Sequence, residues 1–378
     1  MKKILCTLTA FLLLFAVFPG AGAGAKEPVT LNLALYTVIP DYDSFEETIK
    51  AYWAETHPET ELNIVDWDCY SGVMPEDLDV FVIDAADFDA YEAKGALLPL
   101  EEAEIRDYED LIPSFTTGCR VGGTLYALPQ FLCTDLLYTR RGDTELESVR
   151  NLVDLYALLG DDGMLTDMDS DIIRICIYLQ ALMDENHCYM DTFPPLEEET
   201  LSRKAVEALA MLRDMRRKDL AGLPEDGGMY QYARRFADVE GRVYIGYSES
   251  MDLMGDAASE TDFRLISMTD DENIPVFYVD AAAINARIPE EKKALAFDLL
   301  NMITGTDLLV QASQRNGLPR YLLAARGSVY DSLAPDFPLY GRLKEIAMVP
   351  NAHVFRIRPD GSAYLDCAAE NLGLLPAL

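Results

Sequence analysis

The chain has 378 residues and is strongly acidic, with 65 Asp and Glu against 31 Lys and Arg and a formal charge of −34. A charge of this sign argues against nucleic acid or an anionic membrane as the partner, and it suits a cationic small molecule. The alternative is that the excess carboxylate only keeps the protein soluble. Charge alone does not decide between these two interpretations.

The first 25 residues have the layout of a cleavable secretory signal. Lys2 and Lys3 precede an apolar run over residues 4–18, and a stretch of small residues ends at Ala25. We therefore expect a mature protein that begins near Lys26 and is secreted, outside the cell or into the periplasm. No second apolar run approaches the ~20 residues that a membrane-spanning helix needs, so we expect no membrane span. The remaining 353 residues are enough for two domains.

The first part of the chain alternates strands and helices. Leucines at alternate positions predict the first strand, and Ser44 with Glu47 forms a capping-box pattern that predicts the start of the first helix. A continuously apolar run predicts a third strand that is buried on both faces. This order predicts a mostly parallel sheet whose ligands bind at the carboxyl ends of its strands. The predicted elements are a strand at 31–35, a helix after 44, strands at 62–65 and 80–83, and a short helix at 87–94 that ends at Gly95.

The middle of the chain is helical and then returns to strands. Its predicted elements are helices at 149–159, 171–184 and 201–219, strands at 242–247, 263–268 and 275–284, and a helix at 289–303. We infer that the chain crosses to a second lobe near residue 134 and returns near residue 275. The expected fold class is therefore α/β with two lobes and one cleft, each lobe being a mostly parallel sheet flanked by helices. The predicted lobes are residues 26–134 with 275–325, and residues 135–274 with 326–378.

Cys133 stands at the first crossing, where the floor of the cleft is expected. Binding alone needs no nucleophile, so a thiol here suggests that the ligand is attacked as well as held. None of the three histidines lies among other polar candidates, so a carboxylate is the expected base. Glu249 is the best-placed carboxylate, because it lies in a polar loop after a predicted strand. The same loop could equally be the N-cap of a following helix.

Tyrosines and carboxylates at predicted strand ends indicate an aromatic ligand that forms hydrogen bonds. Tyr36 follows the first strand, Asp84 ends the third, and Tyr278 and Asp280 lie on the strand near the return crossing. Carboxylates can accept hydrogen bonds from an amino-substituted ring, and tyrosines can stack on its faces. Each residue alone has a structural alternative, because Asp at a strand end is often an N-cap and the chain contains 20 tyrosines.

Six cysteines remain after the predicted signal: Cys69, Cys119, Cys133, Cys176, Cys188 and Cys367. If Cys133 is a free nucleophile, the other five are odd in number and at least one more thiol is unpaired or intermolecular. The sequence leaves the pairing of these five open. No pair has the close spacing of a structural metal site.

Taken together, these segments resemble type I thiaminase (thiamine pyridinylase), a secreted enzyme on the two-lobed, type II periplasmic-binding-protein-like fold. The resemblance spans nearly the whole chain after residue 25, and the motifs around Cys133 and Glu249 distinguish it from ordinary binding proteins. The segments are Ala34-Leu35-Tyr36 with Pro40-Asp41, residues 66–71, residues 77–84, residues 128–134, Pro224-Glu225-Asp226-Gly227 with Tyr230, residues 245–251, Phe277-Tyr278 with Asp280, residues 319–323 and Val354-Phe355-Arg356.

The resemblance implies a ping-pong substitution on thiamine. Cys133 would add to the pyrimidine ring, the thiazole would leave, and an amine or thiol would accept the pyrimidine. Glu249 would match the family's general base and acid, while Asp84 and Asp280 would match its contacts to the substrate. Its aromatic cleft would correspond to Tyr36, Tyr70, Tyr230, Tyr247 and Tyr278. Thiamine is the substrate, nothing in this chemistry calls for a metal or a cofactor, and we expect a monomer.

Three positions depart from the family pattern. Val38 stands where an aromatic residue is expected, Asp135 where the pattern has Asn, and Cys69 where it has Ser. These departures bear on affinity and substrate choice rather than on the nucleophile or the base. Two other functions stay open: a non-catalytic binding protein for thiamine or a related cationic or pyrimidine ligand, and an enzyme with the same nucleophile that acts on a different aminopyrimidine.

Overall fold

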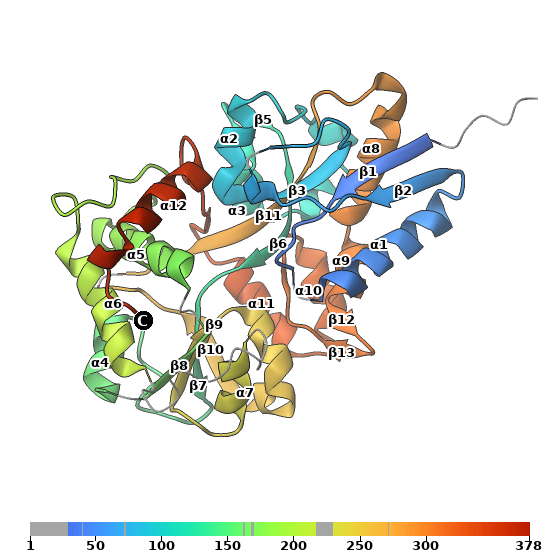
Figure 1. Ribbon diagram of the computed structural model, residues 1–378. Coiled ribbons are helices and arrows are strands. Elements are labelled where there is room, and N and C mark those ends of the chain that lie inside the picture. The colour runs from blue at the N-terminus through green and yellow to red at the C-terminus, as the bar shows by residue number, and fades with distance from the viewer. Residues whose placement is uncertain are drawn as a thin grey trace, which may run out of the picture.

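The computed structural model describes residues 29–39, 41–71, 73–161, 163–167, 170–216, 230–270 and 272–378. The predicted signal, Pro40, the end of the helix predicted at 201–219 and the segment Pro224-Glu225-Asp226-Gly227 lie outside these residues. Two sheets define two lobes, which Figure 1 shows with α1, α8 and α9 in one and α4, α5 and α6 in the other. Among the described residues, no helix is both long enough and apolar enough to span a membrane.

The first lobe is built on a seven-stranded sheet. Its central path has the order β14-β6-β11-β3-β1-β2, and β15 pairs with β11 beside that path. The strands are β1 (Val29–Ala34), β2 (Thr60–Ile64), β3 (Val80–Asp84), β6 (Leu128–Cys133), β11 (Val276–Ile284), β14 (Leu323–Ala324) and β15 (His353–Val354). The helices around it are α1 (Tyr42–Thr56), α2 (Phe88–Ala93), α3 (Pro113–Gly118), α8 (Glu290–Ile303), α9 (Thr306–Ala312), α10 (Gly327–Leu333) and α11 (Leu339–Ala347).

The second lobe is built on a four-stranded sheet with the order β10-β7-β9-β8. Its strands are β7 (Leu136–Arg140), β8 (Met164–Thr166), β9 (Val243–Gly246) and β10 (Thr261–Leu265). Its helices are α4 (Leu152–Leu159), α5 (Asp171–Asn186), α6 (Arg203–Met215), α7 (Gln231–Ala237), α12 (Gly361–Glu370) and the 3₁₀ segment η7 (Ser248–Glu260). Two short hairpins, β4 (Arg120–Val121) with β5 (Thr124–Leu125) and β12 (Gln314–Arg315) with β13 (Leu318–Pro319), complete the strands.

The two-lobed α/β fold was predicted correctly, but both sheets are mixed rather than mostly parallel. In the first sheet β1 pairs in parallel with β2 and β3, as the βαβ pattern predicts, and the short strand β15 pairs in parallel with β11. Strand β11 returns from the second lobe and enters antiparallel between β3 and β6. In the second sheet β7 pairs antiparallel with both β9 and β10. A strand that re-enters a sheet from another lobe has no βαβ crossover to make it parallel.

The boundary predicted at residue 325 also differs from the packing. Helices α10 and α11 pack against β14 and stay with the first lobe. Their apolar residues, among them Tyr330 and Leu343, join the larger hydrophobic core. The chain crosses for the last time after β15, and α12 then packs on α5, as Figure 1 shows in red and green. The short strand β14 pairs with β6 and so holds the next two helices to the first sheet.

The first helix begins earlier than its capping-box pattern predicts. Helix α1 starts at Tyr42, its N-cap is Asp41, and no side chain caps it. Ser44 therefore lies inside the first turn, where it cannot cap the helix. By contrast, α4, α5 and α6 are each capped by a side chain at the residue before the helix, Asn151, Ser170 and Ser202.

The second sheet is buried on both faces, and its side chains alternate between two hydrophobic cores. Tyr138 and Tyr244 face the larger core, which reaches into the first lobe. Leu137, Val243 and Ile245 face the smaller core of the second lobe. Because successive residues of a strand point to opposite faces, one sheet can join the two cores.

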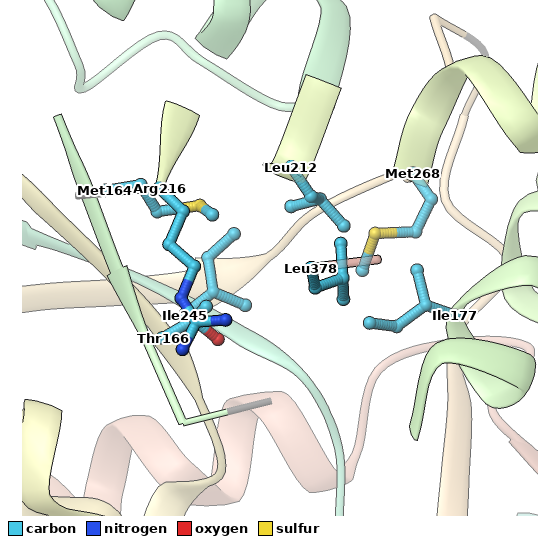
Figure 2. A pocket seen from close by; sticks show the side chains of 8 residues that line it. All are labelled: Met164, Thr166, Ile177, Leu212, Arg216, Ile245, Met268 and Leu378. Carbon is cyan, nitrogen blue, oxygen red and sulfur yellow. The ribbon is translucent and has the colours of Figure 1, made fainter. Parts of the chain in front are cut away.

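The C-terminal residue takes part in the smaller core. Leu378 lines a small cavity of about 10 Å³ together with Leu212, Met268 and Ile177 (Figure 2). Arg174 holds the preceding turn by donating to the carbonyl oxygens of Leu372, Leu375 and Pro376 at 3.4, 2.8 and 3.1 Å. The last residues of the chain therefore support α5, whose first turn lines the cleft described below.

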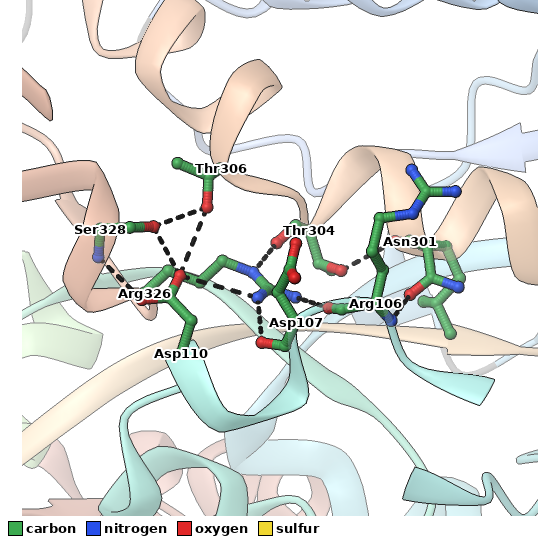
Figure 3. Close-up of polar contacts among 9 residues, drawn as sticks. Arg106, Asp107, Asp110, Asn301, Thr304, Thr306, Arg326 and Ser328 are labelled. Carbon is green, nitrogen blue, oxygen red and sulfur yellow. Dashed lines mark hydrogen bonds and ion pairs between the residues drawn. The ribbon is translucent and has the colours of Figure 1, made fainter. Parts of the chain in front are cut away.

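A buried arginine ties three segments of the first lobe together (Figure 3). Arg326 is 1% exposed and donates to the carbonyl oxygens of Thr304 at 2.5 Å, Asp107 at 2.7 Å and Arg106 at 3.0 Å. Asp110 lies 3.8 Å from the guanidinium and also accepts from the backbone N–H of Ser328 at 2.9 Å. The guanidinium thus supplies donors to the buried carbonyl of Thr304 and to the part-buried carbonyls of Arg106 and Asp107, the last of which also accepts from the backbone N–H of Asp110.

We expect Arg326→Met to destabilise the protein strongly. The apolar replacement leaves the carbonyl oxygens of Thr304 and Arg106 without donors, and each unsatisfied buried group costs ~1–3 kcal/mol, so the free energy of unfolding should fall by about 2 kcal/mol or more. Urea denaturation followed by circular dichroism measures this loss. Lys344→Met is the matched control, because it removes only the exposed ion pair with Asp331, which is worth less than about 1 kcal/mol. Equal losses in the two variants would contradict the role given to Arg326.

Candidate active site

A cavity of about 580 Å³ lies between the lobes. The structure brings all nine predicted site residues to its walls. The first lobe contributes Tyr36, Tyr70, Asp84, Cys133, Tyr278 and Asp280, and the second contributes Tyr230, Tyr247 and Glu249. A volume of this size suits a small organic molecule.

Sheet register places the residues of the first lobe. Tyr278 of β11 lies directly opposite Cys133 at the end of β6, and Asp280 lies opposite Asp84 at the end of β3. Tyr278 and Asp280 are two residues apart on one strand, so their side chains point to the same face. The antiparallel strand therefore carries two site residues between the two strand ends that carry the thiol and the first carboxylate.

Cys133 is a free, half-buried thiol on the cavity wall. Burial raises the pKa of the Cys133 thiol well above its usual range, and the negative charges of Glu249 and Asp280 raise it further. The resting thiol is therefore protonated at neutral pH. Because the thiolate is the nucleophilic form, attack by this residue requires a base.

Glu249 lies at the start of η7, directly after β9, and is buried. Its carboxylate accepts hydrogen bonds from Tyr230 Oη at 2.9 Å and from Ser248 Oγ at 3.3 Å. Burial raises the pKa of the Glu249 carboxyl, while these two hydrogen bonds lower it. Among the carboxylates near Cys133, Glu249 has the largest effect on the thiol. A carboxyl with a raised pKa beside a protonated thiol is suited to exchange a proton with it.

A chain of hydrogen bonds joins two tyrosines to Asp84. Tyr70 Oη donates to Asp84 Oδ2 at 2.5 Å, and Tyr36 Oη lies 2.9 Å from Tyr70 Oη. The backbone N–H of Ala86 donates to the other oxygen, Oδ1, at 2.8 Å. Asp84 therefore has both roles that were predicted for an Asp at a strand end. It caps the 3₁₀ turn η2 (Ala85–Asp87), and it also faces the cavity.

The Asp280 carboxyl differs from that of Asp84 in having no hydrogen-bond partner among the residues that the structure describes. Burial raises the pKa of the Asp280 carboxyl well above its usual range, and the charges of Asp84 and Glu249 add to this effect. Its oxygens face the cavity and are open to a ligand. Asp84, Glu249 and Asp280 thus share one low-dielectric cavity with Asp366 of α12, which favours a bound cation.

An aromatic wall faces these carboxyl groups. Tyr247 and Tyr278 meet edge to face, with ring centroids 6.1 Å apart, and Phe355 packs on Tyr278 with centroids 5.0 Å apart. The sequence reasoning gave no role to Phe355, although it lies in one of the resembling segments. It also missed α12, whose Ser362, Leu365 and Asp366 line the cavity, because no helix was predicted after residue 303.

All six cysteines among the described residues are free. The structure therefore places no disulfide among the five whose pairing the sequence left open. Within the same described residues, no group of three or more His, Cys, Asp or Glu side chains is arranged to hold a metal ion.

Comparison with known proteins shows the family to which the chain belongs. A profile of the Thiaminase-1 domain matches residues 134–269. Thiaminase-1 of Paenibacillus thiaminolyticus is 36% identical over 390 aligned positions, which cover 98% of this chain and 94% of that protein. The chain belongs to the thiaminase-1 family. As a member of this family it is an enzyme of the thiamine pyridinylase class, a group transferase.

Solved structures agree with this assignment and with the fold. Thiaminase I of Clostridium botulinum, in complex with thiamin, superimposes with a TM-score of 0.87 at 36% identity and covers 91% of this chain and 99% of its own. A maltose-bound protein from T. maritima superimposes with a TM-score of 0.62 at 17% identity over 92% of this chain and 99% of its own. This second likeness concerns the fold alone, and it agrees with the predicted type II binding-protein-like architecture.

We expect Glu249→Gln to speed alkylation of the Cys133 thiol, because the charge of Glu249 raises the pKa of that thiol. Removing a negative charge beside the thiol lowers its pKa and so raises the thiolate fraction. At alkaline pH we expect the rate with iodoacetamide to rise, by about tenfold for each unit by which the pKa of the thiol falls. Mass spectrometry of the Cys133 peptide measures the rate, and exposed Cys188 in the same sample is the internal control. A rate that is unchanged or lower would contradict the coupling.

Proposed function

We propose that the protein degrades thiamine by a ping-pong transfer in which Cys133 is the nucleophile and Glu249 is the base and acid. The observation that carries this proposal is the convergence of these two side chains on one cavity from different lobes. Family membership and the thiamin complex of the C. botulinum relative support thiamine as the substrate.

Charge and ring stacking account for binding. Thiamine carries a positive thiazolium, and the cavity carries Asp84, Asp280 and Glu249 together with five tyrosines. A cation is attracted both to the carboxylates and to the faces of aromatic rings. The aminopyrimidine needs acceptors for its amino group, and the free oxygens of Asp280 are suited to that role.

In the first half-reaction the Cys133 sulfur bonds to a carbon of the pyrimidine ring, and the thiol proton passes to Glu249. The bond between the methylene carbon and the thiazolium nitrogen then breaks. Its electron pair leaves with that nitrogen, so the thiazole departs as a neutral molecule. The pyrimidine stays attached to Cys133.

In the second half-reaction an amine or thiol bonds to the methylene carbon and loses a proton. The bond between sulfur and the ring then breaks, and Cys133 recovers its proton from Glu249. The sum is one thiamine cation and one neutral acceptor converted to the substituted pyrimidine, the thiazole and one proton. Tyr230 and Ser248, which donate to Glu249, stabilise its ionised form between proton transfers.

A non-catalytic binding protein would be favoured by a buried or disulfide-bonded Cys133. The thiol is free and lines the cavity, so neither condition holds. We further propose that the enzyme is secreted after removal of residues 1–25. The support is the basic, apolar and small-residue pattern at the start of the sequence, and N-terminal sequencing of protein from the culture medium should begin near Lys26.

Replacing the nucleophile tests the proposed chemistry directly. Cys133→Ser should abolish turnover of thiamine in the presence of an added amine and still bind thiamine, because an alcohol of similar size is a far poorer nucleophile. Glu249→Gln should lose ~10²–10⁴-fold in kcat, as expected for a positioned acid or base. The double variant should be little worse than either single one, since the two groups act as one unit. A Cys133→Ser enzyme that turns over at the wild-type rate would rule out covalent catalysis by this residue.

Asp84→Asn and Asp280→Asn should each reduce kcat/KM for thiamine by about 10-fold. Each replaces an acceptor by an amide that can point a donor at another donor, and an unpaired buried polar group costs ~1–3 kcal/mol. Asp298→Asn is the matched control, because this half-exposed carboxyl lies on α8 outside the cavity. Unchanged kcat/KM in both cavity variants would show that these carboxyls have only a structural role.

The pH profile of kcat/KM tests the state of Glu249. Turnover needs the ionised base, so activity should rise through a pKa above the ordinary value of ~4.3, because burial raises the pKa of Glu249. Tyr230→Phe removes a hydrogen bond that lowers this pKa, so the acid limb should move to higher pH. Tyr91→Phe removes a hydroxyl that donates to the Cys69 carbonyl outside the cavity and should leave the limb in place. An acid limb of Tyr230→Phe that moves down, or not at all, would contradict the assignment.

A further inference from the structure

Asp135 lies two residues after Cys133, in the short link between β6 and β7. It is buried, and its Oδ1 atom has no hydrogen-bond partner among the described residues. Buried polar atoms are nearly always paired with protein or with ordered water, so such an oxygen indicates a missing partner. The mechanism above does not use this residue.

A second oxygen without a hydrogen-bond partner belongs to a residue that lines the same small cavity as Asp135. Asn273 Oδ1 is also buried and without a partner among the described residues, while its Nδ2 donates to the Ile266 carbonyl at 3.1 Å. Both residues line a small cavity of about 10 Å³ behind the cleft, together with Thr134, Gln180 and Tyr278. A cavity of ~10–15 Å³ is the size that holds one water molecule.

The donors around this small cavity are committed elsewhere. Gln180 Nε2 donates both hydrogens, to Asp184 Oδ1 and to the Ile274 carbonyl, each at 2.9 Å. Thr134 Oγ1 donates to the Val276 carbonyl at 2.9 Å, and the Tyr278 hydroxyl is hydrogen-bonded to Cys176. Two acceptors remain without a donor. One water molecule has two hydrogens, so it can donate one to each of these two acceptors.

We propose that Asp135 is a positioning residue for the reaction: with Asn273 it holds one buried water behind the catalytic cysteine, and loss of its own proton hinders activation of the Cys133 thiol. This inference rests on the proposed function, in which Cys133 is the nucleophile. Asp135 does not line the large cavity and acts through the thiol.

The carboxyl of Asp135 changes its protonation state near neutral pH. Burial raises the pKa of Asp135 to about 7, so the carboxyl is neutral in mild acid and charged in mild alkali. The charged form raises the pKa of the Cys133 thiol. The other titratable groups near these two side chains come from several elements: Asp84 from β3, Cys176 from α5, Tyr230 from the start of α7, Tyr247 and Glu249 from the segment after β9, and Tyr278 and Asp280 from β11.

The consequence is an alkaline limit on the reaction. As pH rises through 7, the new charge two residues from Cys133 makes transfer of the thiol proton to Glu249 less favourable. The Glu249 base sets the acid limb of the profile, and Asp135 sets the opposite limb.

Asp135→Asn tests the inference, because it keeps the shape of the side chain and removes its titration. Alkylation of Cys133 by iodoacetamide is measured from pH 5 to pH 9 in the wild type and the variant, by mass spectrometry of the Cys133 peptide. We expect the ratio of the variant rate to the wild-type rate to rise from one in acid to about tenfold in alkali, as one pKa unit of the thiol gives. Its midpoint should lie at or below pH 7, because burial alone raises the pKa of Asp135 to about 7 and the hydrogen bond donated by the water favours the charged form. All other titrating groups are common to both proteins and cancel in the ratio.

Two controls separate this effect from others. Cys188 is exposed and reports the reagent in the same sample, and Asp238→Asn removes a surface charge of the same lobe. A ratio of one at every pH would overturn the proposal, and so would a constant offset, which indicates a structural change. The assay needs no thiamine, so it fails or succeeds independently of the Cys133→Ser turnover experiment.

Turnover and crystallography complete the test. The alkaline limb of kcat/KM near pH 7 should be lost in Asp135→Asn, while the acid limb stays. A crystal structure of the wild-type enzyme that resolves ordered waters should place one within hydrogen-bond distance of both Asp135 Oδ1 and Asn273 Oδ1. An empty cavity, or direct contact of the two side chains, would overturn the water site.

Discussion

The antiparallel entry of β11 between β3 and β6 is the constraint on which the site depends. This one strand sets Tyr278 opposite Cys133 and Asp280 opposite Asp84, and it joins residues that are more than 140 positions apart in sequence. Because side chains alternate along a strand, a slip of one residue would turn both to the other face of the sheet. The apolar stretch Ala281–Ile284, buried in the first lobe, fixes the register against that slip. The packing of this apolar stretch in the core therefore fixes the positions of the site residues on β11.

The same arrangement concentrates groups that repel one another. Asp84, Asp280 and Glu249 lie in one cavity, and burial raises the pKa of each of these carboxyls. No basic side chain lines that cavity among the described residues. The cluster is held by the two sheets and by local hydrogen bonds such as those from Tyr70 and Tyr230, not by mutual attraction. A cationic ligand that binds in this cavity would reduce the repulsion among these carboxyl groups. The repulsion therefore favours binding of a cation.

Local patterns in the sequence predicted the parts of the fold that depend on neighbours in the chain. The alternation in β1, the apolar run of β3 and the helix after Pro289 all follow from side-chain periodicity. The antiparallel direction of β11 could not be predicted this way, since it depends on the pairing of distant strands. The placement of α10 and α11 depends likewise on the two-residue strand β14. The nine site residues that line the large cavity were predicted from strand ends and from the family resemblance, whereas the unpaired oxygens of Asp135 and Asn273 depend on packing between distant segments and are seen only in the structure.

In the proposed mechanism, these features together make the nucleophile dependent on its substrate. A thiol surrounded by carboxylates stays protonated, and a protonated thiol reacts slowly with oxidants and other electrophiles. A positive charge placed beside the same thiol lowers its pKa, the reverse of what the carboxylates do. In the proposed reaction thiamine brings that charge, and Glu249 stands ready to take the proton. In that reaction, the carboxyl groups that raise the pKa of the Cys133 thiol would also attract the cation that lowers it.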